Sequence, residues 1–200
     1  MTRTCFKIAL VGIVLLCLFA CKKTDTSEGF DTLIFSDDTS DAAELVSQAN
    51  ENLNKIKVMY KKNEDQREEL IAAMGEKDAE KVKKITDDLV HLINDGMQLG
   101  EEAVEKISKA QQMNIEPDFK EYLSLKEESL QKQLVAFESR RQAVRLLRDS
   151  FGTNDAALVD KAKLGLKEKE EFFMKTMEES KAISKKANEF AKESSKKIKD

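Results

Sequence analysis

The predicted fold follows from two similar segments of the sequence. They are "MGEKDAEKV", Met74 to Val82, and "FGTNDAALV", Phe151 to Val159. They share Gly, Asp, Ala and Val at the same spacing and lie 77 residues apart. In each segment the glycine can adopt the left-handed conformation that ends one helix, and the aspartate can cap the next helix. Two residues between them reverse the chain tightly. The expected turn and cap residues are Gly75, Asp78, Gly152 and Asp155.

Apolar residues on both sides of these segments recur at intervals of three and four residues, which is the period of amphipathic helices. The same offset of 77 residues aligns Leu53 with Leu130 and Leu70 with Leu147. Pro117 joins the two copies and suits the first turn of a helix. The sequence therefore predicts an all-α fold, an elongated antiparallel four-helix bundle made of two repeated helical hairpins. The expected helices cover residues 41–74, 78–113, 117–151 and 155–197.

Composition agrees with long helices, because tryptophan is absent, proline occurs once and glycine occurs seven times. Gly96 and Gly100 form a pair of small residues inside the second expected helix. We expect this pair to allow a close approach to the first helix near Leu53 and Ile56. The alternative is a break or kink at 94–96.

The N-terminal segment is basic at Arg3 and Lys7 and then apolar for 13 residues, from Ile8 to Ala20. A membrane-spanning helix needs about 20 apolar residues, so this run fits the core of a signal peptide better. It ends on a cysteine that is followed at once by two lysines, in the stretch "LLCLFACKKT".

Leu18, Phe19, Ala20 and Cys21 resemble the lipobox of bacterial lipoproteins. The resemblance implies a diacylglycerol on the Cys21 sulfur, cleavage before Cys21 and acylation of the new amine. Two or three acyl chains anchor a protein stably to a membrane. Lys22 stands where an aspartate often signals inner-membrane retention, so the resemblance favours the outer membrane. The alternative is a chance cysteine at the end of an ordinary secretory signal.

The predicted organisation is a signal peptide at 1–20, a lipidated cysteine with a flexible acidic tether at 21–40, and a helical domain at 41–200. The mature chain has 32 basic and 38 acidic residues and a formal charge of −6. Its lone cysteine leaves no thiol for disulfide, redox or metal chemistry. Within the tether, Phe30 to Phe35 ("FDTLIF") is strongly apolar. We expect it to dock on the helical domain, and the alternative is a partner-binding motif.

Few residues are candidates for chemistry. His91 is the one histidine, with Asp87 and Asp95 four residues away on either side and Asp88 three residues before it. The last spacing resembles a carboxylate-x-x-histidine element of di-iron bundles, but one histidine cannot supply the two elements required. We interpret His91 as a surface residue, with a weak adventitious metal site as the alternative. The sequence shows neither a nucleophilic constellation nor a glycine-rich phosphate loop, so we expect no cofactor and no enzymatic activity.

Two basic groups are candidate binding surfaces. From Lys181 to Asp200 there are seven lysines and three acids, which either pair with the acidic tether or contact anionic lipid. Arginines gather in the half of the bundle nearest the two turns, where they either complement helix ends and nearby acids or form an anion-binding patch. Net charge and export argue against nucleic acid as a partner. The five arginines are Arg67, Arg140, Arg141, Arg145 and Arg148.

The function that the sequence favours is a membrane-anchored envelope lipoprotein acting as a helical structural or protein-interaction module. The alternative is a binding protein for an anionic envelope ligand or an extracellular partner, which would use the arginine-rich end.

Overall fold

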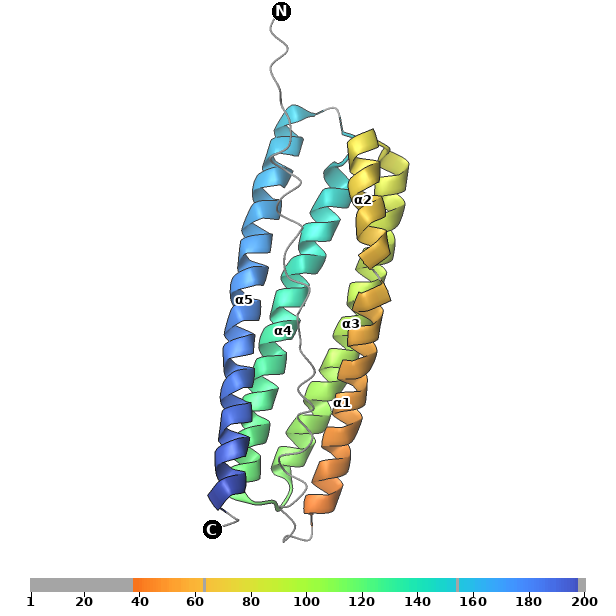
Figure 1. The fold of residues 1–200 in the computed structure, drawn as a ribbon. Coiled ribbons are helices and arrows are strands. Elements are labelled where there is room, and N and C mark those ends of the chain that lie inside the picture. The colour runs from red at the N-terminus through yellow and green to blue at the C-terminus, as the bar shows by residue number, and fades with distance from the viewer. Residues whose placement is uncertain (1–37, 63, 154, 198–200) are drawn as a thin grey trace, which may run out of the picture.

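The computed structural model describes residues 38–62, 64–153 and 155–197, and these form five helices without a strand. The all-α class is therefore confirmed. The helices run along one long axis in Figure 1, with α1 and α2 following one another beside α3. Cys21 and the Phe30–Phe35 segment lie outside the described residues. The helices are α1 (Thr39–Lys62), α2 (Glu64–Glu76), α3 (Ala79–Gln112), α4 (Pro117–Ser150) and α5 (Ala156–Lys197).

Local capping signals set the start of three helices. Asp78 caps α3, because its Oδ1 accepts a hydrogen bond of 3.0 Å from the Lys81 backbone N–H. Pro117 opens α4, where its missing N–H costs nothing. Before α5, Asp155 Oδ1 accepts from the backbone N–H groups of Ala157 and Leu158, at 2.9 and 3.3 Å.

The first turn differs from the expected geometry, because Gly75 lies inside α2 and does not close it. Lys77 adopts the left-handed conformation instead, with φ 59°. The Asp78 N–H donates to Ala73 O at 3.0 Å and the Lys77 N–H donates to Met74 O at 3.3 Å, the two bonds of a Schellman motif. In this motif the left-handed residue directly precedes the residue whose N–H closes it. That closing residue is Asp78, which also caps α3, so the left-handed conformation falls on Lys77 and not on Gly75. In the second turn Gly152 itself has φ 83°.

The helices contact one another in chain order. Helix α3 packs against α1, α2 and α4, and α4 packs against α5. Within the described ranges, the backbones of α1 and α2 do not come close to those of α4 or α5. Ala42 and Ala49 of α1 nevertheless share one buried apolar cluster with Ala187 and Ala191 of α5.

Small residues bring α4 and α5 together. On α4, buried residues recur every seven positions at Ser129, Ala136 and Ala143. On α5, the buried Ser180 and Ala187 are also seven residues apart. The Ser129 hydroxyl donates to Ser180 O at 3.0 Å, and the Ser180 hydroxyl donates to Ser129 O at 2.9 Å. This reciprocal pair satisfies both buried hydroxyls and fixes the register of the two helices.

The apolar core is divided into separate clusters along the axis. The largest lies toward the α3–α4 turn and includes Ile107, Phe119 and Leu123. Another lies at the opposite end, where Leu70 and Val82 pack with Leu147 of α4. Between these clusters on the α3–α4 interface, Arg141 of α4 contacts Asn94 of α3.

Gly100 permits a close three-helix contact on α3. A Cβ there would lie 2.7 Å from Leu134 Cδ2 of α4 and 4.0 Å from Ile56 Cδ1 of α1. Ile56 of α1 thus approaches Gly100 as expected, and Leu134 of α4 approaches it more closely. Helix α3 continues through Asn94 and Gly96 without a break.

Candidate functional site

The arginines of α4 occupy two different sides of the helix. Arg141 and Arg148 contact side chains of α3, whereas Arg140 contacts a side chain of α5. Because α4 packs between α3 and α5, the patch predicted from sequence is divided between two helix interfaces.

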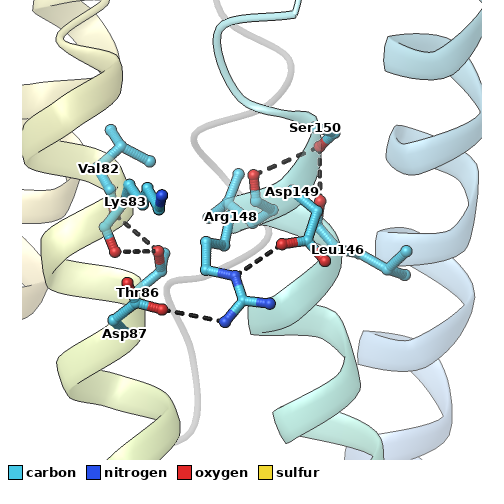
Figure 2. Close-up of polar contacts among 9 residues, drawn as sticks. Val82, Lys83, Thr86, Asp87, Leu146, Arg148, Asp149 and Ser150 are labelled. Atoms are coloured by element: carbon cyan, nitrogen blue, oxygen red, sulfur yellow. Dashed lines mark hydrogen bonds and ion pairs between the residues drawn. The ribbon is translucent and has the colours of Figure 1, made fainter.

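Arg148 connects α4 to α3 near the end that carries the two turns. As Figure 2 shows, its Nη1 donates to Asp87 Oδ1 at 3.0 Å and its Nε donates to Asp149 Oδ1 at 2.7 Å. The hydrogen bonds that the guanidinium donates to Asp149 and Asp87 raise its pKa, and it stays cationic. Beside it, the buried Thr86 hydroxyl donates to Val82 O at 2.8 Å within its own helix. The polar groups around Arg148 are thus occupied by partners within the chain.

Arg141 makes a second polar link to α3, seven residues earlier on α4. Its Nη1 donates to Asn94 Oδ1 at 2.8 Å, and its Nη2 contacts Glu138 Oε2. The other Glu138 oxygen accepts from Gln142 Nε2 at 2.7 Å. Both carboxylate oxygens of Glu138 are therefore engaged on α4.

Arg140 faces α5. Its Nη2 lies 3.7 Å from Glu170 Oε1, and its guanidinium carbon lies 4.5 Å from the centroid of the Phe173 ring. This combines an ion pair with a cation–π contact, and Phe173 is almost fully buried. Arg140 therefore acts in α4–α5 packing.

Arg145 differs from its neighbours on α4. It is half-buried, and it pairs with no acidic side chain in the part of the chain that the structure describes. Arg67 lies on α2, and its side chain is outside the described part. Each of the other three arginines has at least one carboxylate partner, so much of the local positive charge is neutralised. The carboxylates are Asp87, Glu138, Asp149 and Glu170.

His91 is solvent-exposed on α3, as interpreted from the sequence. Asp87, which shares its helical face by spacing, instead pairs with Arg148 at 3.0 Å. Among residues 38–62, 64–153 and 155–197, no cluster of three His, Cys, Asp or Glu side chains is suited to a metal ion.

Lys126 is a half-buried cation that the sequence analysis missed. Burial lowers the pKa of its ammonium group, and the nearby charge of Lys57 on α1 lowers it further. Its Nζ lies 6.0 Å from the centroid of the Tyr122 ring, one turn earlier on α4. The available signal was its spacing of seven and four residues from Phe119 and Tyr122, which places it on their helical face.

Comparison with known proteins gives no match to a family model, a curated protein or a solved structure. In the described ranges, each helix is too short or too polar to cross a lipid bilayer.

Proposed function

We propose that this protein is an envelope lipoprotein, anchored through Cys21, whose helices form a structural or protein-interaction module without catalytic activity. The observation that carries the proposal is the sequence Leu18 to Cys21 at the end of a 13-residue apolar run. The absence of an aspartate after Cys21 favours the outer membrane.

The helical region supports a module held at one end. Asp38 Oδ2 accepts a hydrogen bond of 2.8 Å from the Asn114 backbone N–H, which fixes the start of α1 beside the α3–α4 turn. The segment that leads back to Cys21 therefore leaves from this end. With α3 about 50 Å long at about 1.5 Å per residue, the α2–α3 and α4–α5 turns lie far from the attachment point.

We further propose that the chain is an elongated antiparallel bundle made of two repeated hairpins. Helices α1 and α2 pack on α3 in the first, and α4 packs on α5 in the second. The α3–α4 contacts, including the Arg148–Asp87 pair at 3.0 Å, join the two hairpins. The exposed faces of these long helices offer surface for a protein partner.

The anchor is tested by metabolic labelling with palmitate in the native host. Cys21→Ser should abolish incorporation of the label, because the thiol is the acceptor. Cys17→Ser is the matched control, since Cys17 lies within the predicted signal and should leave labelling intact. Label retained in Cys21→Ser, or no label in the wild type, would refute the anchor.

The interaction role requires a separate measurement. Crosslinking in intact envelopes, followed by purification of this chain from detergent, should recover one specific protein in stoichiometric amount. Recovery of only this chain would contradict a role in binding another protein.

The alternative is an anion-binding function centred on Arg145, which carries a guanidinium without an acidic partner among the described residues. Titration with heparin as the probe should then show saturable, salt-sensitive binding. Arg145→Gln should abolish this binding, while Arg140→Gln should weaken it less because Arg140 already pairs with Glu170 at 3.7 Å. Equal binding by wild type and Arg145→Gln would exclude this alternative.

A further inference from the structure

The last turns of α5 carry a positively charged outer face. Lys185, Lys192 and Lys196 are all exposed, and their spacing of seven and four residues places them on one side of the helix. The opposite side of the same turns is buried at Ala187 and Ser194. These three lysines, called here the lysine face, therefore point away from the packed helices.

Nearby acids neutralise the lysine face only weakly. Lys185 Nζ lies 3.7 Å from Glu189 Oε1, but both side chains are more than half exposed, and exposed pairs of this kind contribute little. Lys192 and Lys196 pair with no acidic side chain in the described part of the chain. From Lys181 to Lys196 there are five lysines and two glutamates, which leaves a formal charge of +3.

The fold also separates the lysine face from the acids of α1. That helix carries Asp41, Glu44 and Glu51 and no basic residue before Lys55. It packs on α3, and its backbone does not approach α5 in the described ranges. In the described part of the chain, none of these three acids pairs with a lysine of the lysine face.

The lysine face lies at the end of the molecule where the chain enters. In Figure 1 the last turns of α5 and the start of α1 are at the same end. The 18 residues from Cys21 to Asp38 span at most about 65 Å when fully extended. An anchored Cys21 would therefore tie the chain to the lipid surface at this end of the molecule.

We propose that the lysine face binds the headgroups of anionic phospholipids and holds the turn-bearing end away from the membrane. This inference rests on the proposed lipid anchor for its setting. Each lysine close to an anionic surface raises membrane affinity about fivefold, so three lysines supply on the order of 100-fold. The attraction acts within a Debye length of about 8 Å at physiological salt, so the helix end must lie close to the headgroups.

The test measures co-sedimentation of residues 21–200 carrying Cys21→Ser, a chain that contains every described helix. Vesicles are made of phosphatidylcholine alone or of phosphatidylcholine with phosphatidylglycerol. At low salt the chain should bind the phosphatidylglycerol vesicles only, and high salt should release it. Equal binding to both vesicle types, or no binding at low salt, would overturn the inference.

Matched variants separate the lysine face from general charge effects. Lys185→Gln, Lys192→Gln and Lys196→Gln together should weaken binding on the order of 100-fold. The control variant replaces three exposed lysines near the starts of α3 and α5, at the turn-bearing end, and so removes the same number of charges. It should bind the vesicles as strongly as the parent chain does. Equal loss in both triples would refute a specific face. The control lysines are Lys83, Lys84 and Lys161.

This outcome is independent of the anchor. The sedimented chain has no lipidated residue, so a negative palmitate result would remove the proposed function and leave vesicle binding unaffected. Conversely, charge-independent sedimentation with intact palmitate labelling would remove only the inference. Helical circular dichroism of both triples checks that each variant is folded.

Discussion

Gly75 and Gly152 occupy equivalent positions in the sequence repeat, yet alanine should have opposite effects at the two sites. Gly75 lies within α2, and a Cβ there would meet nothing within 4 Å. Gly75→Ala should therefore stabilise the protein by about 0.5–1 kcal/mol, because alanine favours the helix and restricts the unfolded chain.

Gly152→Ala should destabilise the protein for two separable reasons. The φ of 83° costs an L-residue about 1–2 kcal/mol. In addition, the new Cβ would lie 2.7 Å from the Ala79 Cβ, far inside an ordinary contact of about 3.5–4.0 Å. Overpacking of this kind costs about 1 kcal/mol or more, and reduced entropy of the unfolded chain offsets about 0.4–1 kcal/mol. The net loss should be about 2 kcal/mol.

Thermal melts followed by far-ultraviolet circular dichroism measure both effects. At about 2–4 °C per kcal/mol for a chain of this size, Gly152→Ala should lower Tm by about 4–8 °C and Gly75→Ala should raise it by about 2 °C. Ala79→Gly in the Gly152→Ala background should recover the steric part and leave the backbone part. The reasoning fails if both glycine variants shift Tm in the same direction, or if the effects of Gly152→Ala and Ala79→Gly are additive.

The remaining predictions concern the helix interfaces. Arg148→Gln should lower the free energy of unfolding in urea by about 1 kcal/mol, because it breaks the contacts with Asp87 and Asp149. Arg145→Gln should leave this free energy unchanged, and equal losses in the two variants would contradict the assigned pairs. Ser129→Leu should cost about 3 kcal/mol or more by overpacking the α4–α5 contact, and Ser129→Ala about 1 kcal/mol by removing a hydrogen bond, as calorimetry would show. Lys126→Met should raise Tm at neutral pH, because the lowered pKa of Lys126 means that its charged ammonium destabilises the folded state. The difference in Tm between the variant and the wild type should shrink as pH rises toward 10.5, because the ammonium then loses its proton and the penalty disappears. A difference in Tm that stays constant with pH would show that Lys126 is not desolvated.

Helix positions and caps could be predicted because their signals are local. The expected helix at 78–113 is observed as Ala79–Gln112, and Pro117 begins α4. An aspartate cap or an initial proline acts on the backbone of the first helical turn, so it sets where the helix begins whatever packs against that helix. The first turn was placed wrongly because glycine permits a left-handed conformation without requiring it, and the hydrogen bonds of Asp78 put that conformation at Lys77.

Sequence patterns were enough to predict that this chain is helical, where three of its helices begin, and which residues carry charge. The charges that meet became known from the packing of the helices. Consecutive residues on a helix point about 100° apart, so the neighbours Arg140 and Arg141 reach different helices, Glu170 on α5 and Asn94 on α3. Partners of this kind are far apart in sequence, and they depend on how whole helix faces pack, which no short segment encodes. For the same reason, only the packed helices show that Lys185, Lys192 and Lys196 pair with no acid of α1 in the described part of the chain.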